Sequence, residues 1–177
     1  MRAFWWISVL AFLLLSGCEG AHYPLGQPTD ATIDEQLIGP WELAYAPEGA
    51  RDDDGKDSFL NIYAFNEHEY LVEGWDEGEE DDLMKLSAFA TTVEGVLFAN
   101  VRCVNCDEDD RDEYFFFSYD LADDGALSVR AINDDLYDDL KDLGSIREVR
   151  RYVVRRLPEP DFFDDEVVVY RRGDVDS

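Results

Sequence analysis

Short stretches of alternating apolar and polar residues, separated by turns, make up most of the chain between residues 39 and 133. An alternation with a period of two is typical of β-strands, whose successive side chains point to opposite faces. Glycine-containing turns such as Glu94–Gly95 and Asp123–Gly125 join the stretches. Strands joined so closely predict an antiparallel meander. The expected strands are 39–45, 58–65, 70–75, 83–93, 96–104, 113–121 and 126–133, with a closing strand at 166–172.

Within the expected strand 113–121, the stretch 114–119 is aromatic on both faces at its start. A sheet wetted on one side would alternate apolar with polar residues, so other elements must cover the second face. Two helices near 134–157 are predicted to do so. The first has a leucine stripe, and the second begins with the capping box Ser145 to Glu148 and ends before Pro158. One face of the second helix is apolar, and the other carries Arg147, Arg150, Arg151, Arg155 and Arg156.

The N-terminal sequence predicts an export signal. Arg2 is the only charge before a nearly unbroken apolar run over 4–15, which is too short to span a membrane and which ends in small residues. The sequence Leu15-Ser16-Gly17-Cys18 resembles the lipobox of bacterial lipoproteins. This resemblance implies cleavage before Cys18, acylation of that cysteine with diacylglycerol and fatty acid such as palmitate, and anchoring in a membrane of the cell envelope. In a host with two membranes, Glu19 favours the outer one.

The chain is therefore expected to have four parts. Residues 1–17 are the signal peptide, and 18–36, which contain Pro24, Gly26 and Pro28, are expected to form a lipid-anchored flexible tether. A β domain with its own core covers 37–172, and 173–177 form a disordered tail.

The opening Gly39-Pro40-Trp41, the meander, the late helices and the closing strand resemble a lipocalin-like (calycin-like) domain. In that group an early tryptophan packs across the barrel floor against an arginine of the last strand. The resemblance implies that Trp41 packs against Arg171 or Arg172. The predicted fold class is mainly β with C-terminal helices, the meander closing into a barrel or half-barrel of about eight strands.

A formal net charge of −27, from 42 acidic and 15 basic residues, excludes nucleic-acid binding as the main role. Because 46% of the chain is hydrophobic, the acidic residues belong to the surface of a folded domain. Adaptation to high salt and drift of an exported domain both explain such a surface. Loops 52–57, 76–82 and 107–113 are rich in carboxylates, but the first does not match a calcium-binding EF-hand loop.

Cys103 and Cys106 end a predicted strand, and three interpretations of the pair are possible. A structural disulfide is favoured because an exported domain meets oxidising conditions. A redox pair would need a helix N-terminus, and a zinc site would need two further ligands, for which only His22 and His68 are available among the histidines. We therefore predict no metal and no cofactor.

No catalytic constellation is visible, so the chain is predicted not to be an enzyme. The leading hypothesis is an envelope lipoprotein whose barrel binds a small apolar ligand or a protein partner. The alternatives are an envelope enzyme or assembly factor with a site on unmarked loops, and a purely structural lipoprotein. An open barrel interior favours the binder, and an interior filled with Phe and Leu favours the structural role.

Overall fold

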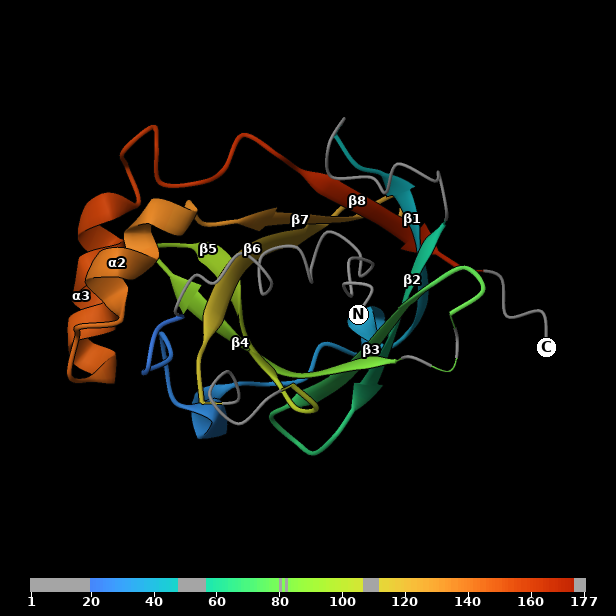
Figure 1. The fold of residues 1–177 in the computed structure, drawn as a ribbon, viewed down its shortest axis with the longest axis horizontal. Coiled ribbons are helices and arrows are strands. Elements are labelled where there is room, and N and C mark those ends of the chain that lie inside the picture. The colour runs from blue at the N-terminus through green and yellow to red at the C-terminus, as the bar shows by residue number, and fades with distance from the viewer. Residues whose placement is uncertain (1–19, 48–56, 80, 82, 107–111, 174–177) are drawn as a thin grey trace, which may run out of the picture.

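Eight antiparallel strands close into a barrel in the computed structural model, which describes residues 20–47, 57–79, 81, 83–106 and 112–173 (Figure 1). Each strand pairs with its neighbours in the chain, and the last strand pairs with the first. The predicted meander is confirmed, and the sheet forms a full barrel. The strands are β1 (Gly39–Tyr45), β2 (Ser58–Ala64), β3 (Tyr70–Asp76), β4 (Met84–Val93), β5 (Val96–Cys103), β6 (Phe115–Leu121), β7 (Leu127–Ala131) and β8 (Val168–Arg172).

The barrel is closed by β1, which pairs with β2 on one edge and with β8 on the other. Trp41 lies opposite Leu60 on β2 and opposite Arg172 on β8. A register shift between Leu43 and Tyr45 bends β1 where it meets β8. Closure leaves no unpaired sheet edge, so every strand has two hydrogen-bonded neighbours.

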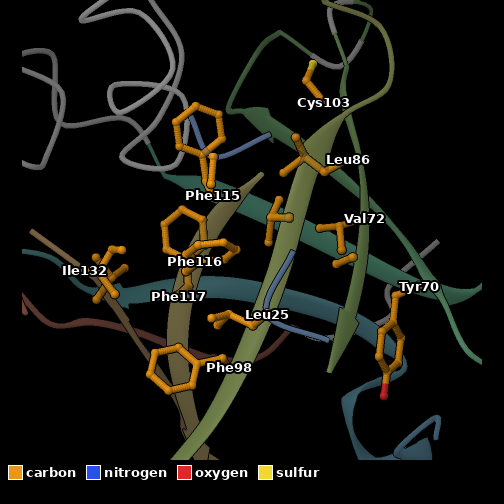
Figure 2. Close-up of a cluster of buried hydrophobic side chains, with 14 of the residues drawn as sticks. Leu25, Tyr70, Val72, Leu86, Phe98, Cys103, Phe115, Phe116, Phe117 and Ile132 are labelled. Carbon is orange, nitrogen blue, oxygen red and sulfur yellow. The ribbon is translucent and has the colours of Figure 1, made fainter. Parts of the chain in front are cut away.

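Alternation along the strands separates the barrel interior from its outer surface. On β2, Leu60 and Ile62 are buried, whereas Asn61 between them is half-buried and Tyr63 is exposed. The same period of two runs along β3 and along the start of β4. The inward residues form the inner core, and Figure 2 shows part of this cluster, including Val72 and Leu86.

A second core lies outside the barrel, against the outer faces of β4, β5 and β6. Phe98 and Phe116 alternate with inward residues and are nevertheless fully buried. Phe98 contacts the rings of Phe162 and Phe163, at 6.4 and 6.1 Å between ring centroids. The hydroxyl of Tyr137 accepts a hydrogen bond of 2.6 Å from the backbone N–H of Phe116. The aromatic character of both faces of β6 therefore has the predicted cause, because other elements cover its outer face.

The covering elements include the two predicted helices, seen at one side of the barrel in Figure 1. They are α2 (Tyr137–Leu140), which follows the 3-10 turn η4 (Asp134–Leu136), and α3 (Ile146–Arg156). The capping box at the start of α3 forms a variant arrangement. The Ser145 hydroxyl accepts from the N–H of Glu148 at 3.3 Å, and the Glu148 carboxylate accepts from the N–H of Gly144 at 2.9 Å.

The segment expected to be a tether is instead packed onto the barrel over residues 20–36, and this part of the prediction is wrong. Ala21 and Leu25 are fully buried, and Ala21 pairs with Tyr114 in a short antiparallel bridge. The N–H of Leu25 donates a 2.7 Å hydrogen bond to the side-chain oxygen of Asn100, which is itself fully buried. We call residues 20–31 the N-terminal arm.

The glycines of the N-terminal arm allow close approach rather than freedom of movement. A Cβ atom on Gly20 would lie 2.9 Å from the Cβ of Glu113, and one on Gly26 would lie 2.9 Å from the hydroxyl of Thr91. Both distances are shorter than a Cβ contact tolerates, so only glycine lets the backbone lie this close to β4 and β6. After the arm, the 3-10 turn η2 (Glu35–Leu37) leads into β1.

Several predictions fall outside the described residues. They concern the signal peptide 1–17, Cys18, the tail from residue 174 and most of the acidic loops 52–57 and 107–113. Within the described residues, no helix is long and apolar enough to cross a membrane.

Candidate functional site

An apolar cavity of about 100 Å³ lies inside the barrel, among the inward side chains of β2 to β7. It lies toward one end of the barrel, where the lining includes Leu37 of η2 and Tyr70 at the start of β3. Toward the other end, Leu43, Met84 and Phe115 are buried and fill the space. The barrel is thus packed over part of its length and hollow over the rest.

Three alanines account for the position of the cavity. Ala88 and Ala90 point inward from β4, and Ala99 points inward from β5 directly opposite Ala90. Interiors of small barrels are normally filled by their side chains, so three methyl groups at neighbouring inward positions leave space that larger residues would occupy. Larger side chains complete the lining: Leu60, Ile62, Phe117, Leu127 and Val129.

Two tyrosines line the cavity near η2. The Tyr70 hydroxyl accepts a 2.6 Å hydrogen bond from the N–H of Asp34, just before η2, and burial raises the pKa of Tyr70. Burial, together with the nearby Tyr70 and Asp34, raises the pKa of Tyr119 to about 12. Both phenols are therefore neutral at pH 7. The cavity then presents no charge to a ligand, which suits an apolar molecule.

The barrel floor contains the predicted tryptophan and arginine. The Trp41 ring is buried, and its indole N–H donates a 2.9 Å hydrogen bond to the carbonyl of Leu37. The Arg172 guanidinium lies 4.1 Å from the centre of the Trp41 ring and donates to the carbonyls of Ile38 and Gln36. This contact fastens the start of β1 and η2 to the end of β8. Arg171 lies on the outer face, opposite Glu42.

Cys103 and Cys106 form a disulfide, as predicted, with 5.7 Å between their Cα atoms. It closes a tight turn at the end of β5. Asn105, inside this turn, accepts from the N–H of Lys85 at 2.8 Å and donates to the carbonyl of Leu83 at 2.8 Å. The turn that the disulfide closes therefore holds the start of β4 against the end of β5. Neither cysteine lines the cavity, although Cys103 pairs with Leu86, which does.

Among the described residues, the carboxyl group with the largest change of pKa is that of Asp164, between α3 and β8. Burial, assisted by the nearby carboxylates of Asp134 and Glu166, raises the pKa of Asp164 to about 6. Arg130, whose side chain donates to the backbone carbonyl of Asp164 at 2.6 Å, partly opposes this shift. Asp164 does not line the cavity, so we treat it as part of the fold.

Neither histidine joins a metal-binding group formed by described residues. His22 is exposed, and the His68 ring is hydrogen-bonded to the carbonyl of Ala31 at 2.7 Å. Within the part of the chain that the structure describes, no three His, Cys, Asp or Glu side chains are placed to hold a metal ion. The cavity is thus the candidate site, and its alanines were not predicted from the sequence. For Ala88 and Ala90, the available signal was their inward phase in the run 86–90.

Fold and cavity together define the class of protein: an up-and-down β-barrel of eight strands with an apolar internal cavity. No protein-family model and no curated protein matches the chain. Among solved structures, a mutant of the fluorescent protein UnaG is similar, with 13% sequence identity and a TM-score of 0.40. The match covers 79% of this chain and 98% of that one. A likeness this remote carries no inference about function.

Proposed function

We propose that this protein is a non-enzymatic lipoprotein of the bacterial cell envelope, anchored through Cys18, whose barrel binds a small apolar ligand. The observation that carries the ligand-binding part is the cavity at Ala88, Ala90 and Ala99. The lipobox resemblance supports the anchor, and the absence of Asp after Cys18 favours the outer membrane in a host with two membranes.

The size of the cavity limits the ligand. At about 100 Å³ it is smaller than an engineered apolar cavity of about 150 Å³ that binds benzene or xenon, and smaller than the ~300–1,000 Å³ typical of drug-sized ligand sites. We therefore propose a ligand whose buried part is a single small ring or a short alkyl chain. A longer molecule would extend out of the cavity.

The test compares two leucine substitutions. Ala99→Leu adds three carbons at the cavity wall, whereas Ala44→Leu adds the same atoms at an exposed position of β1. Binding of xenon and of benzene is followed by NMR, and native mass spectrometry identifies any ligand purified with the protein. We expect both probes to bind the wild type and Ala44→Leu, and not Ala99→Leu. A wild type that binds neither probe and carries no ligand would favour the structural role.

The anchor has an independent test. Cys18→Ser removes the thiol that the thioether requires, so the variant should remain an unlipidated, uncleaved precursor when cells are fed labelled palmitate. Equal labelling of the variant and the wild type would overturn the lipoprotein proposal without affecting the ligand-binding part.

A further inference from the structure

The solvent-facing side of α3 carries four arginines around one exposed apolar residue. We call these four arginines the arginine face: Arg147, Arg150, Arg151 and Arg155. They surround Val154, a residue that is 37% exposed to solvent. The opposite side of the helix packs onto the barrel through Val149, Tyr152 and Val153. Burial therefore fixes which side of α3 faces outward.

Three of these arginines have no ion-pair partner among the described residues. Across the described residues, no carboxylate lies within ion-pair distance of Arg147, Arg151 or Arg155, although the chain has 42 acidic and 15 basic residues. Arg156, on the edge of the same helix, shows the contrast: its guanidinium lies 2.7 Å from the Glu159 carboxylate. In so acidic a protein, an unpaired cationic surface needs a separate explanation.

Helix stability does not supply that explanation. Arg147 lies in the first turn of α3, where the helix dipole disfavours a positive charge. The acid in that turn, Glu148, is occupied with the N–H of Gly144. Arg155, in the last turn, does complement the dipole, and its guanidinium lies 5.4 Å from the centre of the Tyr152 ring.

The N-terminal arm lies on the same side of the molecule. Arg150 donates to the carbonyl of Leu25, in the arm, at 3.4 Å, and to the carbonyl of Thr92 at 2.9 Å. Figure 1 shows the arm beside the lower part of α3. The arm begins at Gly20, whose N–H donates to the Glu113 carboxylate at 2.8 Å. Two residues of chain span at most about 7 Å, so a lipid on Cys18 would keep this side close to the membrane.

We propose that the arginine face is a docking surface for anionic lipid headgroups, which orients the anchored domain on its membrane. The inference rests on the proposed anchor at Cys18. A net charge of −27 repels the domain as a whole from an anionic surface, but an anchor prevents it from leaving. The anchored domain then turns its unpaired arginines toward the lipid phosphates, with which guanidinium groups form charge-assisted, bidentate hydrogen bonds.

The experiment reproduces the anchor chemically. Since Cys103 and Cys106 are paired, Cys18 is the single free thiol of the chain from residue 18 onward, and it can be coupled to a maleimide lipid. The coupled protein is placed on vesicles of phosphatidylcholine, with or without phosphatidylglycerol. Arginine modification by a phenylglyoxal reagent is then followed residue by residue by mass spectrometry, with exposed Arg171 on β8 as the internal control.

We expect Arg147, Arg151 and Arg155 to react at least about threefold more slowly on anionic than on neutral vesicles at low salt, and Arg171 to react equally on both. High salt should remove the difference. In Arg147→Gln/Arg155→Gln, the protection of Arg151 should fall, whereas Arg171→Gln should leave it unchanged. Each of these outcomes supports the proposal.

Equal rates for Arg147, Arg151 and Arg155 on the two vesicles would overturn it, as would protection of Arg171 instead. Protection that rises with protein concentration in the absence of vesicles would assign the arginine face to a second copy of this chain, and would also overturn it. Because the coupling is chemical, these results do not depend on acylation in the cell. Palmitate labelling tests that separately, so failure of the docking surface and failure of the anchor are distinguishable.

Discussion

Replacing Leu25 by alanine tests whether the N-terminal arm belongs to the folded domain. Leu25 is fully buried in the outer core, and its backbone N–H is bound to the side chain of Asn100. Figure 2 shows it among the strands, near Phe98. A leucine in a flexible tether would contribute nothing to stability, whereas a leucine at this position contributes through the apolar surface that it buries and the space that it fills.

The expected cost of Leu25→Ala is about 2–5 kcal/mol, the range for truncating a fully buried leucine where the surroundings cannot collapse. Total stabilities of domains are about 5–15 kcal/mol, so the effect is large. For a domain of this size, each kcal/mol lowers the melting temperature by about 2–4 °C, so a loss of about 3 kcal/mol lowers it by about 6–12 °C. Urea denaturation gives the free energy, and calorimetry gives the melting temperature.

Tyr23→Ala is the matched control, because Tyr23 lies in the same arm and is 40% exposed. It should change the stability by less than about 0.5 kcal/mol. Amide exchange at Ala21 and Leu25, both hydrogen-bonded, should accelerate in Leu25→Ala and not in the control. A cost below about 0.5 kcal/mol for Leu25→Ala, with fast exchange at both amides already in the wild type, would refute the docked arm.

Four further results are expected. Cys103→Ala should destabilise by about 2 kcal/mol in urea denaturation, because the disulfide closes only a short loop; free thiols in the unreduced protein would contradict the bond. Arg172→Ala should lower the free energy of unfolding by about 1–3 kcal/mol, because it removes the contact with Trp41 and two hydrogen bonds. Arg171→Ala should lower it by less than about 0.5 kcal/mol, and equal losses for the two variants would contradict the special role of Arg172. The pKa of Asp164 is raised to about 6, so the folded protein holds a proton that the unfolded chain has released. Asp164 therefore contributes to the free energy of unfolding at low pH, and this contribution is lost as the pH rises from about 4 to about 6. After allowance for solvent screening, the loss is about 1 kcal/mol. Asp164→Asn should lack this step, so the difference in stability between the wild type and the variant should change between about pH 4 and pH 6; stability–pH curves of identical shape would count against the shift. Finally, the melting temperature should rise between about 0.1 and 1 M sodium chloride as the net charge is screened; a flat profile would mean that local pairing already neutralises it.

The strands and helices could be predicted because their signals are local. Alternation on β2 and β3 follows from one wet face and one dry face, and the glycines of the turns at Gly95 and Gly125 have positive φ angles. The aromatic pattern of β6 indicated a covered outer face before the covering elements were known. Helix α3 was marked at its start by Ser145.

The arm and the cavity could not be predicted, because both depend on contacts between distant parts of the chain. Leu25 gives no periodic signal, and it is buried only because Asn100 and the outer core receive it. Proline and glycine near it suggested flexibility, but Gly20 and Gly26 serve close packing. Likewise, Ala90 and Ala99 are ordinary strand residues until the register places them opposite each other.

Closure of the barrel by β1 and β8 also bears on how fast the chain can fold. Trp41 cannot meet Arg172 until almost the entire chain is available, and the loop that this contact closes includes most of the protein. Long loops cost chain entropy before the contact compensates for it, and proteins rich in such distant pairings fold in milliseconds to seconds. A chain still emerging from the ribosome therefore lacks its last strand and stays open. If the protein is exported as we propose, this delay would keep the polypeptide unfolded until it has crossed the membrane.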